Sequence, residues 1–169
     1  MDRTLTNLTP DLSNADPELR ERINQGHYAV LSQVDYFREN FGQTESSWKK
    51  DGTRVTVVDE TISENLFLPL RKIFSSDDFC SEESIETPEP VPLKAEFCWL
   101  LDPVDGTNNY AVGITECGIS LALLHHGTPI YGFIYDYSRD MLLQGGPGLG
   151  AIEGTVPVQA ATKLVNEKL

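Results

Sequence analysis

The spacing of apolar residues divides the chain into helical stretches followed by short strands. Apolar residues recur every three or four positions across residues 17–42, which predicts one helix that ends at Gly42. A second helix is predicted from Asp59, and Pro69 is expected to kink or split it. Residues 55–58 fit either a short strand or the entry to this second helix.

Short apolar segments parted by turn residues dominate the second half of the chain. The predicted strands cover residues 78–83, 97–101, 118–124, 130–135 and 141–144, with a last one in the tail from residue 155. Helices first and strands later predict an α+β fold, in which two helices pack on one face of an antiparallel sheet. We expect a loose lead-in at 1–16 and a single domain at 17–169.

The acidic balance of the chain limits its partners. A formal charge of −13 over 169 residues makes nucleic acid an unfavourable partner, because phosphate backbones repel such a surface. Either the negative charge reflects only the solubility of the surface, or some of the carboxylates form a cluster that binds divalent cations. The net charge alone does not distinguish these two explanations. We find no signal peptide and no apolar run long enough for a bilayer, so we expect a cytoplasmic protein without a membrane partner.

Cysteines and histidines indicate structural roles. The cysteines are odd in number and widely spaced, which favours unpaired thiols in a reducing compartment; they are Cys80, Cys98 and Cys117. His27 lies on the apolar face of the first predicted helix and is expected in or beside the core. His125 and His126 precede a turn and are expected at the surface.

An apolar strand runs directly into the segment Asp-Pro-Val-Asp-Gly-Thr. Pro103 fixes its own φ and Gly106 permits tight turning. A turn here would bring the carboxylates of Asp102 and Asp105 and the carbonyl of Val104 to one point. The same residue types also occur in ordinary surface turns, so this segment by itself leaves a structural loop open.

A second acidic pair extends the first. Glu82 and Glu83 end the preceding predicted strand, so at least three carboxylates meet if the two strands are neighbours. Carboxylates in contact repel unless one is protonated or a cation lies between them. Oxygen ligands without a nearby histidine or cysteine favour Mg²⁺, followed by Mn²⁺ or Ca²⁺. The backbone N–H groups of Asp105 to Thr107, with a short helix from about residue 107, form a place for a phosphate.

Three segments resemble the inositol monophosphatase family of lithium-sensitive, Mg²⁺-dependent phosphatases. Residues 99–110, Trp-Leu-Leu-Asp-Pro-Val-Asp-Gly-Thr-Asn-Asn-Tyr, resemble the first family motif. Residues 79–84 resemble its Gly-Glu-Glu strand end, with Ser81 in place of the usual glycine. Residues 49–59 are similar to a third stretch, with Arg54 where proline is common. The resemblance implies the N-terminal domain of the inositol monophosphatase and fructose bisphosphatase fold.

The resemblance also implies a metal site and a reaction. Glu82 and Asp102 would bind a first Mg²⁺ together with the Val104 carbonyl, and Asp102 and Asp105 would bind a second. Two or three Mg²⁺ ions are implied for a complete site, with Mn²⁺ as a substitute. The implied reaction is hydrolysis of a small phosphorylated alcohol or sugar, by in-line attack of activated water on phosphorus.

The same resemblance assigns the remaining roles. Glu82 and Thr107 would position and activate the attacking water, and Glu83 would support them. Asp105 and the amides of Gly106 and Thr107 would hold the phosphate. The supporting candidates are Lys49 and Asp59.

One departure from the family pattern affects the expected activity. Family members continue into a second α/β domain with a Trp-Asp-x-Ala-like motif, whose aspartate completes the second metal site. The tryptophans here are Trp48 and Trp99, followed by Lys49 and Leu100, so neither matches. We therefore expect the C-terminal α/β domain to be absent and the second ion to be one ligand short.

Three hypotheses follow from this departure. The chain is a phosphatase whose other half lies elsewhere, a catalytically inactive metal- or phosphate-binding remnant or interaction module, or a homo-oligomer in which a neighbouring subunit supplies the missing acid. We also expect an exposed apolar patch where the second domain would pack, and hence self-association or a partner.

Overall fold

The structure, a computed structural model, describes residues 12–13, 15–48, 54–84 and 93–159. Its helices are α1 (Pro17–Leu31), α2 (Val34–Asn40), α3 (Val57–Ile73) and α4 (Thr107–Val112), with a 3₁₀ turn η1 (Glu82–Ser84). Its strands are β1 (Ser46–Trp48), β2 (Arg54–Thr56), β3 (Asp78–Ser81), β4 (Phe97–Asp105), β5 (Gly118–His125), β6 (Thr128–Asp136), β7 (Met141–Gly146), β8 (Gly150–Glu153) and β9 (Val156–Val158). No helix within the described ranges is both long and apolar enough to cross a membrane.

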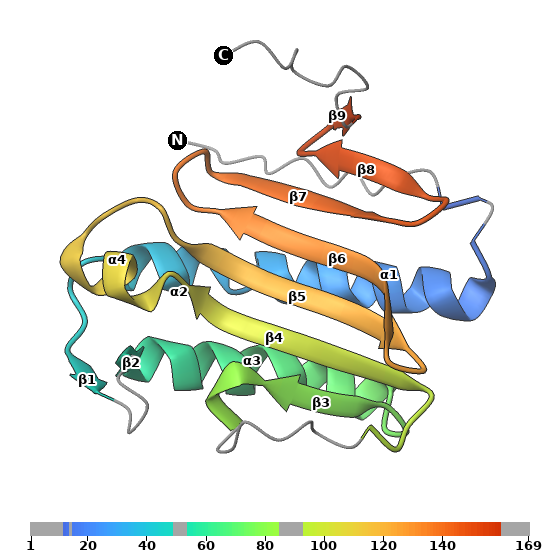
Figure 1. The fold of residues 1–169 in the computed structure, drawn as a ribbon, viewed down its shortest axis with the longest axis horizontal. Helices are drawn as coiled ribbons and strands as arrows, with labels where there is room; N and C mark the ends of the chain where they lie inside the picture. The colour runs from blue at the N-terminus through green and yellow to red at the C-terminus, as the bar shows by residue number, and fades with distance from the viewer. Residues whose placement is uncertain (1–11, 14, 49–53, 85–92, 160–169) are drawn as a thin grey trace, which may run out of the picture.

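A seven-stranded sheet forms the centre of the fold, with strand order β3-β4-β5-β6-β7-β8-β9. Strands β3 and β4 run parallel, and every other neighbouring pair in this sheet is antiparallel. Figure 1 shows α1 lying along β5 and β6, and α3 along β3 and β4, so two helices cover the sheet. The predicted α+β class is confirmed, and the parallel pair makes the sheet mixed rather than wholly antiparallel.

Several predicted element boundaries were wrong. The single helix expected over 17–42 is two helices, and at the break the hydroxyl of Ser32 donates to the carbonyl of Ala29 (2.8 Å), an alternative to the regular helix bonds. Helix α3 runs through Pro69, because the buried side chains of Leu66 and Leu70 hold both sides of it against the core. Strand β8 was not predicted, whereas the strand expected after residue 155 is present as β9.

Each long helix begins with a side-chain cap. The carboxylate of Asp16 accepts a hydrogen bond from the Glu18 amide (2.8 Å), and Pro17 occupies the first turn of α1. Leu12 and Ala15, in the predicted lead-in, are buried in the core. Residues 1–11 of that lead-in lie outside the described part of the chain.

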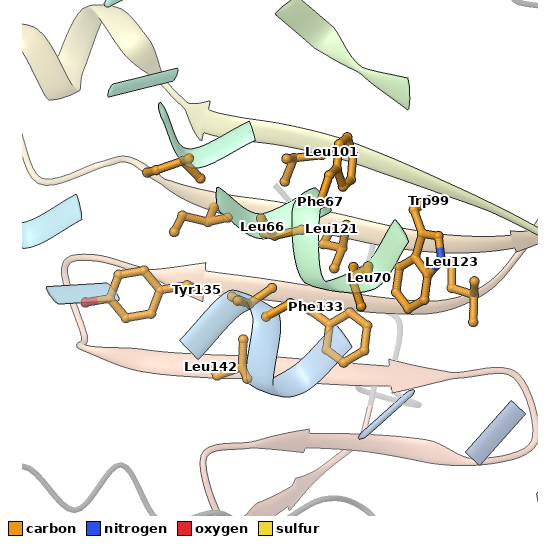
Figure 2. Close-up of a cluster of buried hydrophobic side chains, with 14 of the residues drawn as sticks. Leu66, Phe67, Leu70, Trp99, Leu101, Leu121, Leu123, Phe133, Tyr135 and Leu142 are labelled. Carbon is orange, nitrogen blue, oxygen red and sulfur yellow. The ribbon is translucent and has the colours of Figure 1, made fainter. Parts of the chain in front are cut away.

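The core lies between the two long helices and one face of the sheet. Figure 2 shows Leu66 and Leu70 of α3 among Trp99, Leu101 and Leu121 of the strands, and all five side chains are almost fully buried. Helix α1 approaches equally closely at a glycine, since a Cβ added to Gly26 would lie 2.8 Å from the ring of Phe133. This packing fixes both helices over β4, β5 and β6.

A buried ion pair joins α1 to the parallel edge of the sheet. Arg22 donates to both carboxylate oxygens of Asp77, at 2.9 Å from Nε and 2.8 Å from Nη2. The indole N–H of Trp99 donates to the same carboxylate (3.0 Å). Both charged side chains are at least 96% buried, and the Arg22 guanidinium also lies 3.9 Å from the ring centre of Phe97. One carboxylate therefore connects α1, the residue before β3, and β4.

Replacing Arg22 by methionine should lower the free energy of unfolding by about 3–5 kcal/mol, because the Asp77 carboxylate would stay buried without its cation. Chemical denaturation measures the change. Arg71→Met is the control, since this exposed arginine lies over the rings of Phe67 and Phe79 and its loss should cost about 0.5–1 kcal/mol. Equal costs for the two variants would contradict the role given to the buried pair.

Candidate metal centre

The parallel pairing of β3 with β4 brings two predicted ligands together. Ser81 at the end of β3 lies opposite Leu101, so Glu82 and Asp102 follow at the same level of the sheet. The strand predicted over residues 78–83 is present as β3, but it stops at Ser81, and the acidic pair that follows it begins the turn η1. Ser63 of α3 fixes this corner, because its hydroxyl lies 2.8 Å from that of Ser81.

A bulge in β4 places Asp102 and Asp105, which are three residues apart, on the same side of the strand. Residues with this separation point to opposite faces of a regular strand. Asp102 pairs with Ser120 and Asp105 with Gly118, so three steps along β4 match two steps along β5. The extra residue turns Asp105 back toward the side of Asp102. The predicted turn at 102–107 is thus a bulged strand that continues to Asp105, followed directly by α4.

Gly106 connects β4 to α4, and no residue with a side chain fits at this position. Its φ of 82° is left-handed, and an added Cβ would lie 2.8 Å from the carbonyl oxygen of Glu116. Helix α4 then starts at Thr107, as predicted. The buried Tyr110 anchors α4, because its hydroxyl donates to the carbonyl of Phe37 (2.7 Å). The N–H groups of the first turn have no partner within the helix and stay available to an anion.

The hydroxyl of Thr107 lies beside the carboxylate of Asp59, which comes from α3. Thr56 and Asp59 form a capping box at the start of that helix, and one Asp59 oxygen accepts from both the amide (2.8 Å) and the hydroxyl (2.6 Å) of Thr56. The other Asp59 oxygen lies 3.4 Å from the Thr107 hydroxyl, which also lies 2.9 Å from the carbonyl oxygen of Val104. Asp59 is buried, so the fold holds this carboxylate in place beside Thr107.

The acids repel one another in the absence of a cation. Burial and the neighbouring carboxylates of Glu82 and Asp105 raise the pKa of Asp102 to about 7, although its bond from the Val104 amide (3.2 Å) acts in the opposite direction. A hydrogen bond between the side chains of Glu82 and Asp102 raises this pKa further. Among the described residues, the acids do not form a trio whose ligand atoms all lie within 4.8 Å of one another. Oxygen donors with this excess of negative charge suit a hard divalent cation.

The described structure assembles most of the predicted site. Glu82, Asp102 and Asp105 lie close enough to interact electrostatically, with Val104 and Thr107 beside them. The backbone N–H of Glu83 donates to the hydroxyl of Ser81 (3.3 Å), which places Glu83 directly after the end of β3. Lys49 lies outside the described residues.

The sequence did not lead us to predict a role for Ser63. This residue lies one helical turn beyond Asp59, so the spacing along α3 could have indicated that it is near the site.

Comparison with known proteins gives a consistent result. The pattern of the "Inositol monophosphatase family" matches residues 22–169. The chain is 30% identical to the fructose-1,6-bisphosphatase/inositol-1-monophosphatase of Aquifex aeolicus over 138 residues, 79% of this chain and 50% of that protein. It is 31% identical to inositol monophosphatase 1 of Solanum lycopersicum over 109 residues, 64% of this chain and 40% of that protein.

Solved structures share the fold. The IMPase of Thermotoga maritima superimposes with a TM-score of 0.74 at 23% identity, covering 84% of this chain and 54% of that one. An IMPase/NADP phosphatase complexed with Mg²⁺ and phosphate gives 0.71 at 23% identity, covering 85% and 55%. The chain thus spans about half the length of these proteins, or somewhat less.

Asp102→Asn should change stability in opposite directions with and without Mg²⁺. A raised pKa costs the folded protein stability as the pH rises from about 4 through 7, since the charged form is disfavoured. At pH 8 the metal-free variant should therefore be more stable than the parent by about 1–2 kcal/mol. The stabilisation that Mg²⁺ gives the parent should be lost in the variant, as measured by thermal unfolding.

The control for this test is Asp35→Asn, which removes an exposed carboxylate from α2 and should alter stability by at most about 0.5 kcal/mol. It should also retain the full effect of Mg²⁺. An Asp102→Asn protein that Mg²⁺ stabilises as strongly as the parent would disprove the assignment of Asp102 as a ligand.

Proposed function

The chain belongs to the inositol monophosphatase family, and we propose that it forms the metal-binding half of a Mg²⁺-dependent phosphomonoesterase. The observation that carries the proposal is the convergence of Glu82, Asp102 and Asp105 beside the Thr107–Asp59 pair. The substrate class is a small phosphorylated alcohol or sugar, supported by relatives named as inositol monophosphatases. A cytoplasmic location stays a prediction from the sequence.

The donor set fits magnesium. Glu82, Asp102 and the Val104 carbonyl would hold a first ion, and Asp102 with Asp105 a second, with Mn²⁺ as a substitute. When bound, Mg²⁺ supplies neutralising charge and makes water more acidic. A related structure complexed with Mg²⁺ and phosphate supports this choice of ion. The raised pKa of Asp102 gives an independent reason for it, because a cation removes the repulsion that keeps the carboxyl protonated.

The residues of this chain would then prepare water for attack on phosphorus. The Thr107 hydroxyl donates its single proton to Asp59 or to the Val104 carbonyl, so its free lone pairs accept a hydrogen bond from water. Glu82 would accept the other proton of this water as the oxygen–phosphorus bond forms. The bond between phosphorus and the alcohol oxygen breaks on the opposite side, and the proton taken up by Glu82 returns through solvent water to the leaving alcohol oxygen. The amides of Gly106 and Thr107 hold the phosphate during this exchange.

We propose that a further portion of the protein, or another chain, completes the site. The chain covers half or less of the full length of these curated relatives. By the family resemblance, an acid for the second ion and a pocket for the leaving group are expected from a further α/β portion. The sheet face opposite α1 and α3 suits such a portion. Leu100 and Ile134 on that face are 40% and 50% exposed, which supports this placement. A separate chain or a second copy of this one are the alternative sources.

Thr107→Val should lower kcat about 100-fold or more in a form of the protein that is active, because the isosteric side chain cannot orient water. KM and the Mg²⁺-induced thermal stabilisation should stay nearly unchanged. The matched control is Thr61→Val, which removes an exposed hydroxyl that bonds to Val57 within α3. Activity of Thr107→Val equal to that of the control would contradict the role of this hydroxyl.

The function itself is tested by Mg²⁺-dependent release of phosphate from inositol 1-phosphate. The chain is assayed alone and with the polypeptide that carries the complementary α/β portion. Activity that appears only in the mixture supports the proposed half-site. Mg²⁺ binding without turnover in either assay supports the alternative, an inactive metal-binding remnant or interaction module. Absence of both Mg²⁺ binding and turnover in folded protein rejects the phosphatase reading.

A further inference from the structure

The end of the sheet remote from the acids carries a second group of metal-binding side chains. Glu96, His125 and His126 each offer one ligand atom, and these atoms all lie within 4.8 Å of one another. Glu96 precedes β4, whereas Asp102 and Asp105 lie near its other end, on the order of 20 Å away along the strand. In Figure 1 the β5–β6 hairpin lies at the right-hand end of the sheet and α4 at the left.

Hairpin geometry brings these residues together. The turn between β5 and β6 consists of His126 and Gly127, with φ values of 47° and 77°. Two left-handed residues make a tight turn that normally favours Asn-Gly, so a histidine in the first position is unusual. The amide of His126 donates to the carbonyl of Glu96 (2.8 Å), which fixes the turn against the start of β4.

The side chains are already arranged around a common point. Nε2 of His125 lies 2.9 Å from Oε1 of Glu96, and the two imidazole rings lie 4.3 Å apart between centroids. The ring of Phe97 lies 4.8 Å from that of His125 and limits its movement.

The chemistry of this trio differs from that of the acidic site. Imidazole nitrogen favours zinc and similar first-row transition ions over Mg²⁺. Metal–ligand bonds of about 2.0–2.1 Å in a tetrahedral site put ligand atoms about 3.3 Å apart. At 2.9 Å, the nearest atoms of His125 and Glu96 are already close to this spacing, and the exposed side chain of His126 can turn toward them.

Two cavities that share Glu96 as a lining residue adjoin the trio and leave space for further ligands. One of about 450 Å³ is lined by Glu96 and His125 together with Asp16 and Glu18. The other, of about 520 Å³, is lined by Glu96 and His126 together with Lys94 and Gly127. Water or a small ligand can therefore reach an ion held between them.

We propose that Glu96, His125 and His126 bind one zinc-type divalent ion, with water in the remaining position, at a site separate from the acidic centre. In the metal-free protein the contact between Glu96 and His125 holds two ligands together. When an ion binds, any proton on Nε2 of His125 moves to Nδ1 or to solvent, so that Nε2 can act as a ligand. The site depends on neither the phosphatase activity nor the binding of Mg²⁺.

The test is a Zn²⁺ titration at pH 7.5 against a chromophoric chelator, with excess Mg²⁺ to occupy the acids at the other end of the sheet. One tightly bound equivalent is expected. His126→Asn should weaken Zn²⁺ binding at least tenfold while preserving the turn, because asparagine adopts the same left-handed φ. Glu96→Gln should weaken it similarly. The control Glu60→Gln, which removes an exposed carboxylate from α3, should have no effect.

The thiols of Cys80 and Cys98 are the competing zinc ligands, since their sulfur atoms lie 3.8 Å apart. Cys80→Ser should leave Zn²⁺ affinity unchanged. Co²⁺ in the site should give the visible bands of nitrogen and oxygen ligation, without thiolate charge-transfer absorption. Absence of Zn²⁺ binding, unchanged affinity in His126→Asn, or loss of binding in Cys80→Ser would each overturn the proposal.

Discussion

The buried carboxylate of Asp77 accepts two hydrogen bonds from Arg22 and one from the indole of Trp99, so one charge joins α1, the entry to β3, and β4. Asp77 directly precedes β3, and the sheet register follows from this anchor. A shift of β3 by one residue would separate the anchor from Trp99 and move Glu82 away from Asp102. The position of the acidic site is therefore fixed by a contact at the opposite end of the same two strands.

The acidic site is assembled against its own electrostatic repulsion. The core between α1, α3 and the sheet supplies the rigidity that holds Asp102 near Glu82 and Asp105, and the raised pKa of Asp102 reflects the cost. A hard cation removes that cost. At the other end of the sheet the Glu96 carboxylate lies 2.9 Å from an imidazole nitrogen of His125 rather than beside another carboxylate. The two ends of β4 thus offer different chemistry to different ions.

Local pattern and short-range chemistry could be predicted from the sequence, and long-range pairing could not. The helix beginning near Asp59, the helix start at Thr107 and the acidic end of β3 follow from residue spacing and turn chemistry. The bulge between Asp102 and Asp105 depends on the register with β5, which no local pattern specifies. Helix α3 passes through Pro69 because packing outweighs the lost hydrogen bond. His126 was expected only at the surface, since its relation to Glu96 exists only once the hairpin pairs with β4.

The bond between His27 of α1 and Gln144 of β7 (3.0 Å) spans 117 residues, and it has a consequence for biosynthesis. A ribosome makes about 5–20 residues per second, so roughly ten seconds separate the two partners. Helix α1 can form early, but the fully buried Ile23 and Val30 on its apolar face have no sheet to cover them until β5 and β6 emerge. During that interval the nascent helix is a natural client for chaperones, and slow translation would prolong its exposure.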